Sequence, residues 1–152
     1  MKRKWLAFGI ILLFAGTYII PAAAQNTQKQ SSRGEWLYVG GSGPGNYTRI
    51  QDAINESSDG DTVFVYDDSS PYLENILIDK SISVVGEDCN STVILGNSST
   101  DIMNIIGERV NLTGFTIEVT NNDYYFSYLS IDANNTLICN NILKNITISS
   151  GR

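Results

Sequence analysis

The amino-acid sequence predicts an all-β protein, a parallel β-helix of about three coils whose amino-terminal end is closed by an amphipathic helix. Short apolar runs recur after residue 62 with polar breaks of only a few residues. Such breaks leave no room for the crossover helices that an ordinary parallel α/β sheet requires. Similar five-residue segments also repeat at a nearly regular spacing. A β-sandwich remains the competing fold, since it too has short strands separated by turns.

The repeated segments begin at Ile82, Val110 and Leu137, which are 28 (110 − 82) and 27 (137 − 110) residues apart. In each segment the first and third residues are candidates for the interior, and the fifth is Gly or Asn, which tolerate left-handed backbone. This spacing suits one coil of a parallel β-helix. The expected interior ladder is Ile82, Val84, Val110, Leu112, Leu137 and Cys139.

One helix is predicted over about residues 48–58, immediately before the first coil. Thr48 and Gln51 have the spacing of a capping box, in which each side chain binds the backbone amide of the other residue. Ile50, Ala53 and Ile54 form one apolar stripe. Because so short a helix is marginal in water by itself, we expect this stripe to cover the open end of the first coil.

The first residues have the pattern of an export signal, with a basic start, an apolar stretch over residues 6–20 and small residues before a cleavage site near Ala24. An uncleaved membrane anchor is the alternative, but a span needs about 20 apolar residues. The predicted organisation is a signal peptide at 1–24, a flexible linker at 25–34 and a β-helix domain at 35–152, with coils at about 61–150. The expected location is secreted or at the cell surface.

Charge and composition exclude several functions. The formal net charge is −6, and it becomes −9 when Lys2, Arg3 and Lys4 leave with the signal peptide. Nucleic-acid binding is therefore not expected, because it depends on cationic side chains. The chain has no histidine, which removes the commonest general base and transition-metal ligand. Cys89 and Cys139 are too few for a disulfide scaffold, and whether they pair is left open.

Several segments resemble a known group of proteins. YTRIQDAINESSDGDTVFVY (47–66), YLENILIDKSI (72–82) and VGED (85–88) resemble the amino-terminal cap and first coil of exported prokaryotic right-handed parallel β-helix proteins. This is the pectin-lyase-like group, which includes archaeal surface proteins. LTGFTI (112–117) and ICNNI (138–142) resemble its repeats, the second in the style of the NosD-like family. The resemblance covers about residues 36–148 and implies a fold without implying one function, since such folds host lyases, hydrolases, copper-delivery factors and passive surface modules.

The leading functional hypothesis is an exported, non-catalytic surface module that binds glycans or has a structural role. The alternative is a polysaccharide lyase or glycoside hydrolase of the same fold, or an amino-terminal fragment of one. The expected partner is a polysaccharide or surface glycan, and no catalytic residue is assigned. The candidate sugar-stacking residues are Tyr124, Tyr125, Phe126 and Tyr128, which alternatively fold back into the core.

No cofactor is expected apart from calcium, for which Asp67 and Asp68 are the candidate ligands; the alternative is a turn, since DDSSP is a typical turn sequence. Further candidates for lyase-type chemistry are Glu87, Asp88, Lys80 and Arg109, for which the alternative is a surface role.

Asn-x-Ser/Thr sequons predict glycosylation candidates at Asn46, Asn55, Asn90, Asn97 and Asn134. Asn111 and Asn145 also begin sequons, but they lie beside predicted strands and are expected to be the least accessible.

The chain stops directly after a strand-like run over about residues 144–152. An uncapped coil presents unpaired strand edges, which favour aggregation or pairing. We therefore expect either a chain truncated relative to a longer form or self-association through this coil.

Overall fold

The structure, a computed structural model, describes residues 34–96, 101–119 and 128–150 of the 152-residue chain. These residues belong to one compact unit, Ser31–Arg152. Within them the chain forms one short helix and twelve strands of three or four residues. In chain order the elements are β1 (Trp36–Val39), α1 (Ile50–Glu56), β2 (Thr62–Val65), β3 (Ile76–Ile78), β4 (Ser83–Gly86), β5 (Val93–Gly96), β6 (Met103–Ile105), β7 (Asn111–Thr113), β8 (Thr116–Val119), β9 (Tyr128–Ile131), β10 (Leu137–Cys139), β11 (Ile142–Lys144) and β12 (Thr147–Ser150).

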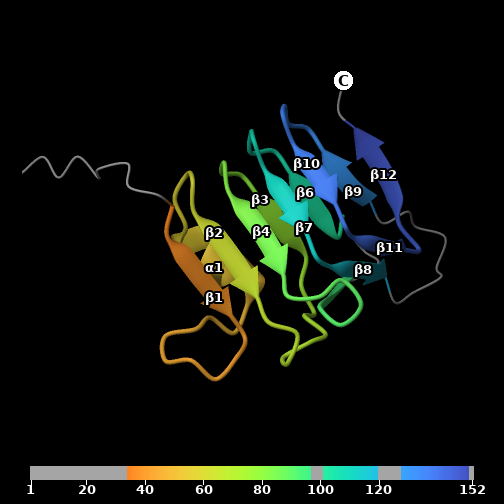
Figure 1. The fold of residues 1–152 in the computed structure, drawn as a ribbon. Coiled ribbons are helices and arrows are strands. Elements are labelled where there is room, and N and C mark those ends of the chain that lie inside the picture. The colour runs from red at the N-terminus through yellow and green to blue at the C-terminus, as the bar shows by residue number, and fades with distance from the viewer. Residues whose placement is uncertain (1–33, 97–100, 120–127, 151–152) are drawn as a thin grey trace, which may run out of the picture. The chain divides into compact units, whose positions relative to one another are not determined.

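The strands form three sheets in which every pairing is parallel. The strand orders are β1-β2-β4-β7-β10, β5-β8-β11 and β3-β6-β9-β12. The chain visits the three sheets in turn, so that equivalent strands of successive turns lie side by side (Figure 1). The result is a β-solenoid of about four turns, which confirms the predicted parallel β-helix and rules out the sandwich.

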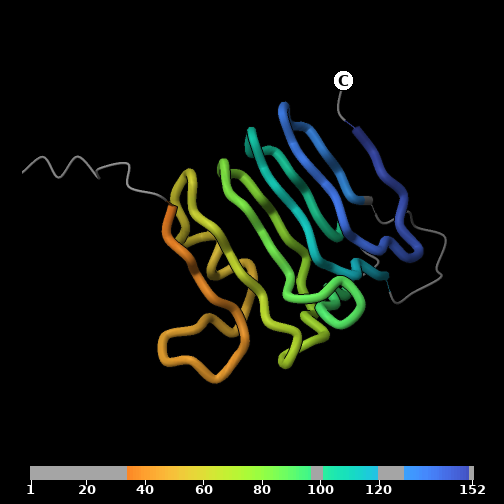
Figure 2. The backbone as a smooth tube through the Cα atoms, viewed as in Figure 1, coloured from red at the N-terminus to blue at the C-terminus, as the bar shows by residue number. Residues whose placement is uncertain are grey.

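The helix α1 lies against β1, β2 and β3 in the first part of the solenoid (Figure 2). Ile50, Ala53 and Ile54, the predicted apolar stripe, are completely buried. They join Val39 and Val63 in the apolar core. Because these side chains lose all contact with water, the helix is stabilised mainly by this packing, as expected for an element of seven residues.

The core is built from residues stacked in register across the turns. In the largest sheet Val63, Val84 and Leu112 occupy matching positions and are all completely buried. Burying one such side chain contributes about 1.5–3 kcal/mol. Ile82 and Val110 are also buried, so four residues of the predicted interior ladder lie inside.

The last two residues of the predicted ladder do not. Leu137 pairs with Asn111 and is 57% exposed, and Cys139 pairs with Thr113 and is only half-buried. The structure places Ile138 beside Leu112 instead, so this repeat is 26 residues long (138 − 112) and not 27. Side chains alternate between the two faces of a strand, and a shift of one residue therefore exchanges inside and outside.

The number of turns is also larger than the repeat indicated. Between β2 and β4 the chain needs only 21 residues to return to the same sheet, since Thr62 pairs with Ser83 (83 − 62). In this short turn the second sheet contributes a single bridge, between Tyr72 and Ile94. A turn of this length lies outside the 27–28 spacing, and this raises the count from about three to about four.

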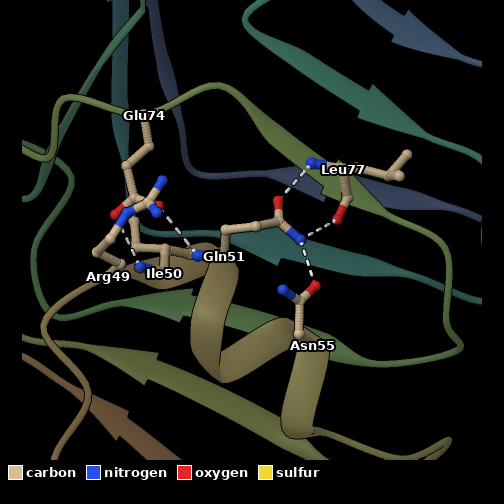
Figure 3. A network of polar contacts seen from close by, with 6 residues as sticks. All are labelled: Arg49, Ile50, Gln51, Asn55, Glu74 and Leu77. Carbon is tan, nitrogen blue, oxygen red and sulfur yellow. Dashed lines mark hydrogen bonds and ion pairs between the residues drawn. The ribbon is translucent and has the colours of Figure 1, made fainter.

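The predicted capping box is wrong. The helix begins at Ile50, its N-cap is Arg49, and Arg49 makes no capping hydrogen bond through its side chain. The carboxylate of Glu74 binds the first helical amides instead, because the amides of Ile50 and Gln51 donate to its two oxygens at 2.8 and 3.0 Å (Figure 3). A negative charge at this end of a helix is stabilised by the free N–H groups and by the helix dipole.

Two further side chains join the helix to the strand region after Glu74. The Gln51 side chain accepts from the amide of Leu77 at 2.8 Å and donates to its carbonyl at 3.2 Å (Figure 3). At the other helix end, the Lys80 ammonium donates to the carbonyls of Ile54, Asn55 and Ser57 at 2.6–2.9 Å. A carboxylate therefore caps the N-terminal end of the helix and an ammonium group the C-terminal end. These charges are opposite in sign to the partial charges that the helix dipole places at the two ends.

Candidate functional site

Four aromatic side chains come together on the outer surface of β1 and β2. Trp36 and Tyr38 alternate in β1 with the inward Leu37 and Val39. Tyr38 pairs with Phe64 of β2, and Tyr66 follows two residues later on the same side. Because alternate residues of a strand point to one face, the register of these two strands brings the rings together. We call Trp36, Tyr38, Phe64 and Tyr66 the aromatic face.

Each ring of the aromatic face has at least two ring neighbours. The Tyr38 and Tyr66 rings are stacked, with centroids 6.1 Å apart and planes inclined by 24°. Phe64 meets Tyr66 edge-on at 5.1 Å, and Trp36 lies 6.3 Å from Tyr38 and 6.2 Å from Phe64. These separations fall in the range where aromatic pairs attract each other, so the rings support one another in fixed orientations.

The aromatic face remains open to solvent. Trp36 is 56% exposed and Tyr38 is 38% exposed. Phe64 and Tyr66 are half-buried. Isolated exposed apolar residues are common, but a contiguous cluster of large rings on an outer surface is typical of a binding site.

A pocket of about 500 Å³ adjoins this face and shares its two tyrosines. The other walls are the loop at residues 41–44, Asn46 and Asp68. The loop leaves β1 and returns at Tyr47, whose carbonyl accepts the amide of Gly40 at 2.8 Å. We call this cavity the loop pocket.

Two glycines and two polar side chains hold the loop against the solenoid. Gly40 and Gly41 have φ angles of 73° and 69°, which disfavour side chains, and a Cβ on Gly41 would come within 2.8 Å of the Tyr66 ring. The amide of Gly41 donates to Asp68 Oδ1 at 2.9 Å, and Asn46 Nδ2 donates to the carbonyl of Gly40 at 2.6 Å. The wall of the pocket is therefore attached to both β1 and the turn after β2.

Tyr72 supports the site from the inside. Its hydroxyl donates to the carbonyl of Tyr66 at 2.7 Å, and its ring is almost completely buried. Burial is the main cause that raises the pKa of Tyr72 to about 12; a hydrogen bond with Ser69 acts in the opposite direction, and the nearby Asp68 carboxylate adds to the increase. The phenol is therefore neutral throughout the physiological range.

This pKa predicts a loss of stability in strong alkali. Since the folded-state pKa lies above the ordinary value of 10.0, the contribution of the neutral Tyr72 is complete below pH 10 and is lost as the pH rises towards 12. We expect Tyr72→Phe to flatten the decline in unfolding free energy between these limits, as measured by urea unfolding at several pH values. Tyr38→Phe, at the exposed surface, is the control. Equal slopes for Tyr72→Phe and the unmodified chain would show that Tyr72 does not contribute.

The structure does not test the predicted sugar-stacking residues. Tyr124, Tyr125 and Phe126 lie outside the described residues. Tyr128 begins β9, but its side chain is also outside the described part. These four positions stay a prediction.

The candidate calcium ligands lie in the turn beside the loop pocket and are already bonded within it. Asp67 Oδ2 accepts from the Ser91 hydroxyl at 2.6 Å, and Asp68 Oδ1 accepts from Gly41 and, at 3.2 Å, from the Ser69 hydroxyl. Among the described residues no group of three or more His, Cys, Asp or Glu side chains is arranged to hold a metal ion. Calcium binding at Asp67 and Asp68 remains a prediction that these contacts do not favour.

Three of the four remaining candidate charged residues, Glu87, Asp88 and Lys80, have local hydrogen-bond partners. Glu87 Oε2 accepts the amide of Asp67 at 3.1 Å, and two hydrogen bonds from Asn90 lower the pKa of Asp88. Lys80 caps the helix, as described above. Arg109 lines a second pocket, of about 390 Å³, beside Asp59 and Asp61.

The acids of this second pocket stabilise turns. Asp59 Oδ1 accepts the amide of Ser81 at 2.9 Å. Asp61 accepts the amides of Glu35 and Ser58 at 2.8 and 2.7 Å, one on each oxygen. These oxygens are occupied by backbone donors, an arrangement typical of a structural role and not of a pair of catalytic carboxylates.

The sequons differ in exposure. Asn55, Asn90 and Asn134 are exposed, Asn46 is half-buried in the loop pocket, and Asn97 lies outside the described residues. Asn111 is partly buried, and its Oδ1 has no hydrogen-bond partner among the described residues. Asn145 was expected to be among the least accessible sequons, but it is exposed; it lies between β11 and β12 and has a φ of 57°.

Two other features bear on the sequence predictions. Cys89 and Cys139 are both free thiols. No helix within the described residues is long and apolar enough to cross a membrane.

The aromatic face was missed in the sequence, although a signal for it was present. Both WLYV and TVFVY alternate aliphatic and aromatic residues, and this alternation separates the inward side chains from the outward ones.

Searches of the whole chain against protein-family models, curated proteins and solved structures returned no match.

Proposed function

We propose that this chain is an exported, non-catalytic β-helix module of the cell surface, related to the pectin-lyase-like and NosD-like repeat proteins, and that it binds glycans through the aromatic face. The export signal at residues 1–24 supports the location, and the resemblance of residues 36–148 supports the relationship. The aromatic face with its adjoining pocket is the observation that carries the binding function.

The geometry suits a sugar ligand. The C–H groups of a sugar ring pack on aromatic rings, and its hydroxyl groups need polar partners at the edge of the contact. The Tyr38 and Tyr66 rings offer such a surface, and the loop pocket offers the Asp68 carboxylate and backbone groups beside it. The rigid strands β1 and β2 hold the rings in place before the ligand arrives, which lowers the entropic cost of binding.

Calorimetric titration with a panel of neutral, amine-bearing and uronate oligosaccharides tests this proposal. We expect at least one class to bind, and we expect Tyr38→Ala to weaken that binding about tenfold, equivalent to about 1.4 kcal/mol. Leu137→Ala is the matched control, because Leu137 is also an exposed apolar residue on the outside of the same sheet, three strands away from β2.

Two outcomes would contradict the proposal. Binding to no oligosaccharide in the panel would remove the glycan function. Cleavage of any of them, with or without calcium, would replace it by the alternative, a lyase or hydrolase.

A further inference from the structure

We propose that the loop pocket selects sugars that carry a free amine, so that the preferred ligand is a polysaccharide containing amino sugars that are not acetylated. This inference rests on the proposed glycan-binding function and specifies the chemical class of the ligand. It depends on three features of the pocket: one carboxylate with an oxygen that no described residue binds, two stacked tyrosine rings and the absence of a cation among the lining residues that the structure describes.

The first feature is the carboxylate of Asp68. Its Oδ1 accepts the amide of Gly41 and the hydroxyl of Ser69, which fix its orientation. Its Oδ2 accepts no hydrogen bond from the described residues, and the side chain is exposed. A carboxylate with a fixed position and a free oxygen is a suitable partner for an ammonium group, because charge-assisted hydrogen bonds are stronger than neutral ones.

The second feature is the pair of rings. The faces of Tyr38 and Tyr66 carry negative electrostatic potential, and an ammonium group near them is attracted by about 0.5–1 kcal/mol at an exposed site. The same rings pack against the C–H groups of the sugar. One amino sugar therefore satisfies the apolar and the charged parts of the pocket together.

The third feature is the local charge. The described residues contain four cationic side chains, and none of them lines the loop pocket. Two of them form ion pairs elsewhere: Arg49 Nε lies 3.8 Å from Glu74 Oε2, and Lys144 Nζ lies 3.6 Å from Glu118 Oε2. Lys80 caps the helix, and Arg109 lines the second pocket. Asp67 precedes Asp68 in the turn after β2, and its amide donates to the carboxylate of Glu87, which follows β4.

This distribution discriminates between classes of polysaccharide. A uronate or sulfated glycan would place its negative charge beside Asp68 with no cation to compensate, and like charges repel. An N-acetylated sugar has the same ring but no charge, and a neutral sugar has only hydroxyl groups. The free amine is the substituent that gains from Asp68.

The test compares four oligosaccharides of equal length by calorimetric titration of the full chain: a glucosamine oligomer, its N-acetylated form, a glucose oligomer and a galacturonate oligomer. We expect the glucosamine oligomer to bind at least tenfold more tightly than the N-acetylated and glucose oligomers, and the galacturonate oligomer to bind most weakly. The preference for the amine should decrease as salt is added, because the contact is partly exposed.

Variants distinguish the pocket from the general acidity of the chain. Asp68→Asn keeps an oxygen that can accept the Gly41 amide, and we expect it to reduce the ratio of amine to neutral affinity about tenfold. Asp88→Asn removes the same charge from the neighbouring turn, outside the loop pocket, and should leave this ratio within about twofold. The circular dichroism spectrum verifies that both variants are folded.

The outcomes separate this inference from the proposed function. If no oligosaccharide binds, both are wrong. If the neutral oligomers bind as tightly as the glucosamine oligomer, or if Asp68→Asn leaves the ratio unchanged, the glycan function stands and the selection of amines is overturned. The same holds if galacturonate binds most tightly.

Discussion

Replacing Ile54 with Asp is expected to lower the free energy of unfolding by more than about 4 kcal/mol, the range reached when a charge is buried without a partner. Ile54 is completely buried between α1 and the first turns of the solenoid. The new carboxylate must either lose its hydration there or displace the helix. Displacement would expose Ile50 and Ala53, which cover the same apolar surface.

Urea unfolding of the purified chain measures this effect, with Leu73→Asp as the control. Leu73 precedes Glu74 and is 74% exposed, so its replacement should change the free energy of unfolding by less than about 0.5 kcal/mol. We also expect Ile54→Asp to reduce solubility, because displacement of the helix uncovers the core. If Ile54→Asp has the stability and solubility of the unmodified chain, α1 does not act as a cap.

Replacing Glu74 with Ala is expected to lower the free energy of unfolding by about 3 kcal/mol. Glu74 is only 6% exposed, and its carboxylate accepts the first two helical amides (Figure 3). Without it, the buried Ile50 amide loses its acceptor, and leaving one buried donor without a partner costs about 1–3 kcal/mol. The loss of the favourable charge at the helix N-terminus adds to this cost.

Glu74→Gln and Glu56→Ala define the origin of the effect. Gln retains one acceptor oxygen without the charge, so its loss should be intermediate between those of Glu74→Ala and the unmodified chain. Glu56 is an exposed residue at the last position of α1, where a negative charge gains nothing from the dipole. Its replacement by Ala should leave stability within about 0.5 kcal/mol. Equal losses for Glu74→Ala and Glu56→Ala would contradict the capping role.

The fold was largely predictable because the apolar runs recur and the helix has one apolar stripe. The errors have local physical causes. The final repeat is one residue shorter than the interval in the sequence suggested. Because successive residues of a strand face opposite sides, an error of one residue exchanges the inward and outward positions. The prediction therefore assigned Leu137 and Cys139 to the interior. Asn140, with φ of 53°, forms the corner opposite Gly114, one residue before the position that the alignment favoured.

The helix cap was unpredictable from local sequence rules. Thr48 and Gln51 have the correct types and spacing for a capping box, yet Gln51 binds Leu77, and Glu74 supplies the cap from 24 residues away. A contact of this range depends on how the first turn brings β3 beside the helix. A local motif records only which groups are available and not which partner is nearer after folding.

The candidate site illustrates the same limit. The aromatic residues at 124–128 lie close together in the sequence, interrupted only by Ser127. The aromatic face is assembled from two segments whose paired residues, such as Tyr38 and Phe64, are 26 positions apart. Aromatic and aliphatic residues both count as apolar, so a hydrophobic pattern does not separate outward rings from inward ones. The pairing of β1 with β2 provides this information, because it shows that Leu37 and Val63 occupy the inner face together.

The most direct test of glycan binding at the aromatic face is the fluorescence of Trp36 during titration with oligosaccharides. The chain has two tryptophans, Trp5 and Trp36, and Trp5 lies in the predicted signal peptide, so a chain that begins at residue 25 carries Trp36 alone. We predict a saturable change in the emission of Trp36 that gives the same affinity as the calorimetric titration. In Tyr38→Ala the affinity obtained from this change should be about tenfold lower. Calorimetric binding without any change in Trp36 emission, or with Tyr38→Ala unaffected, would place the ligand elsewhere and contradict the account.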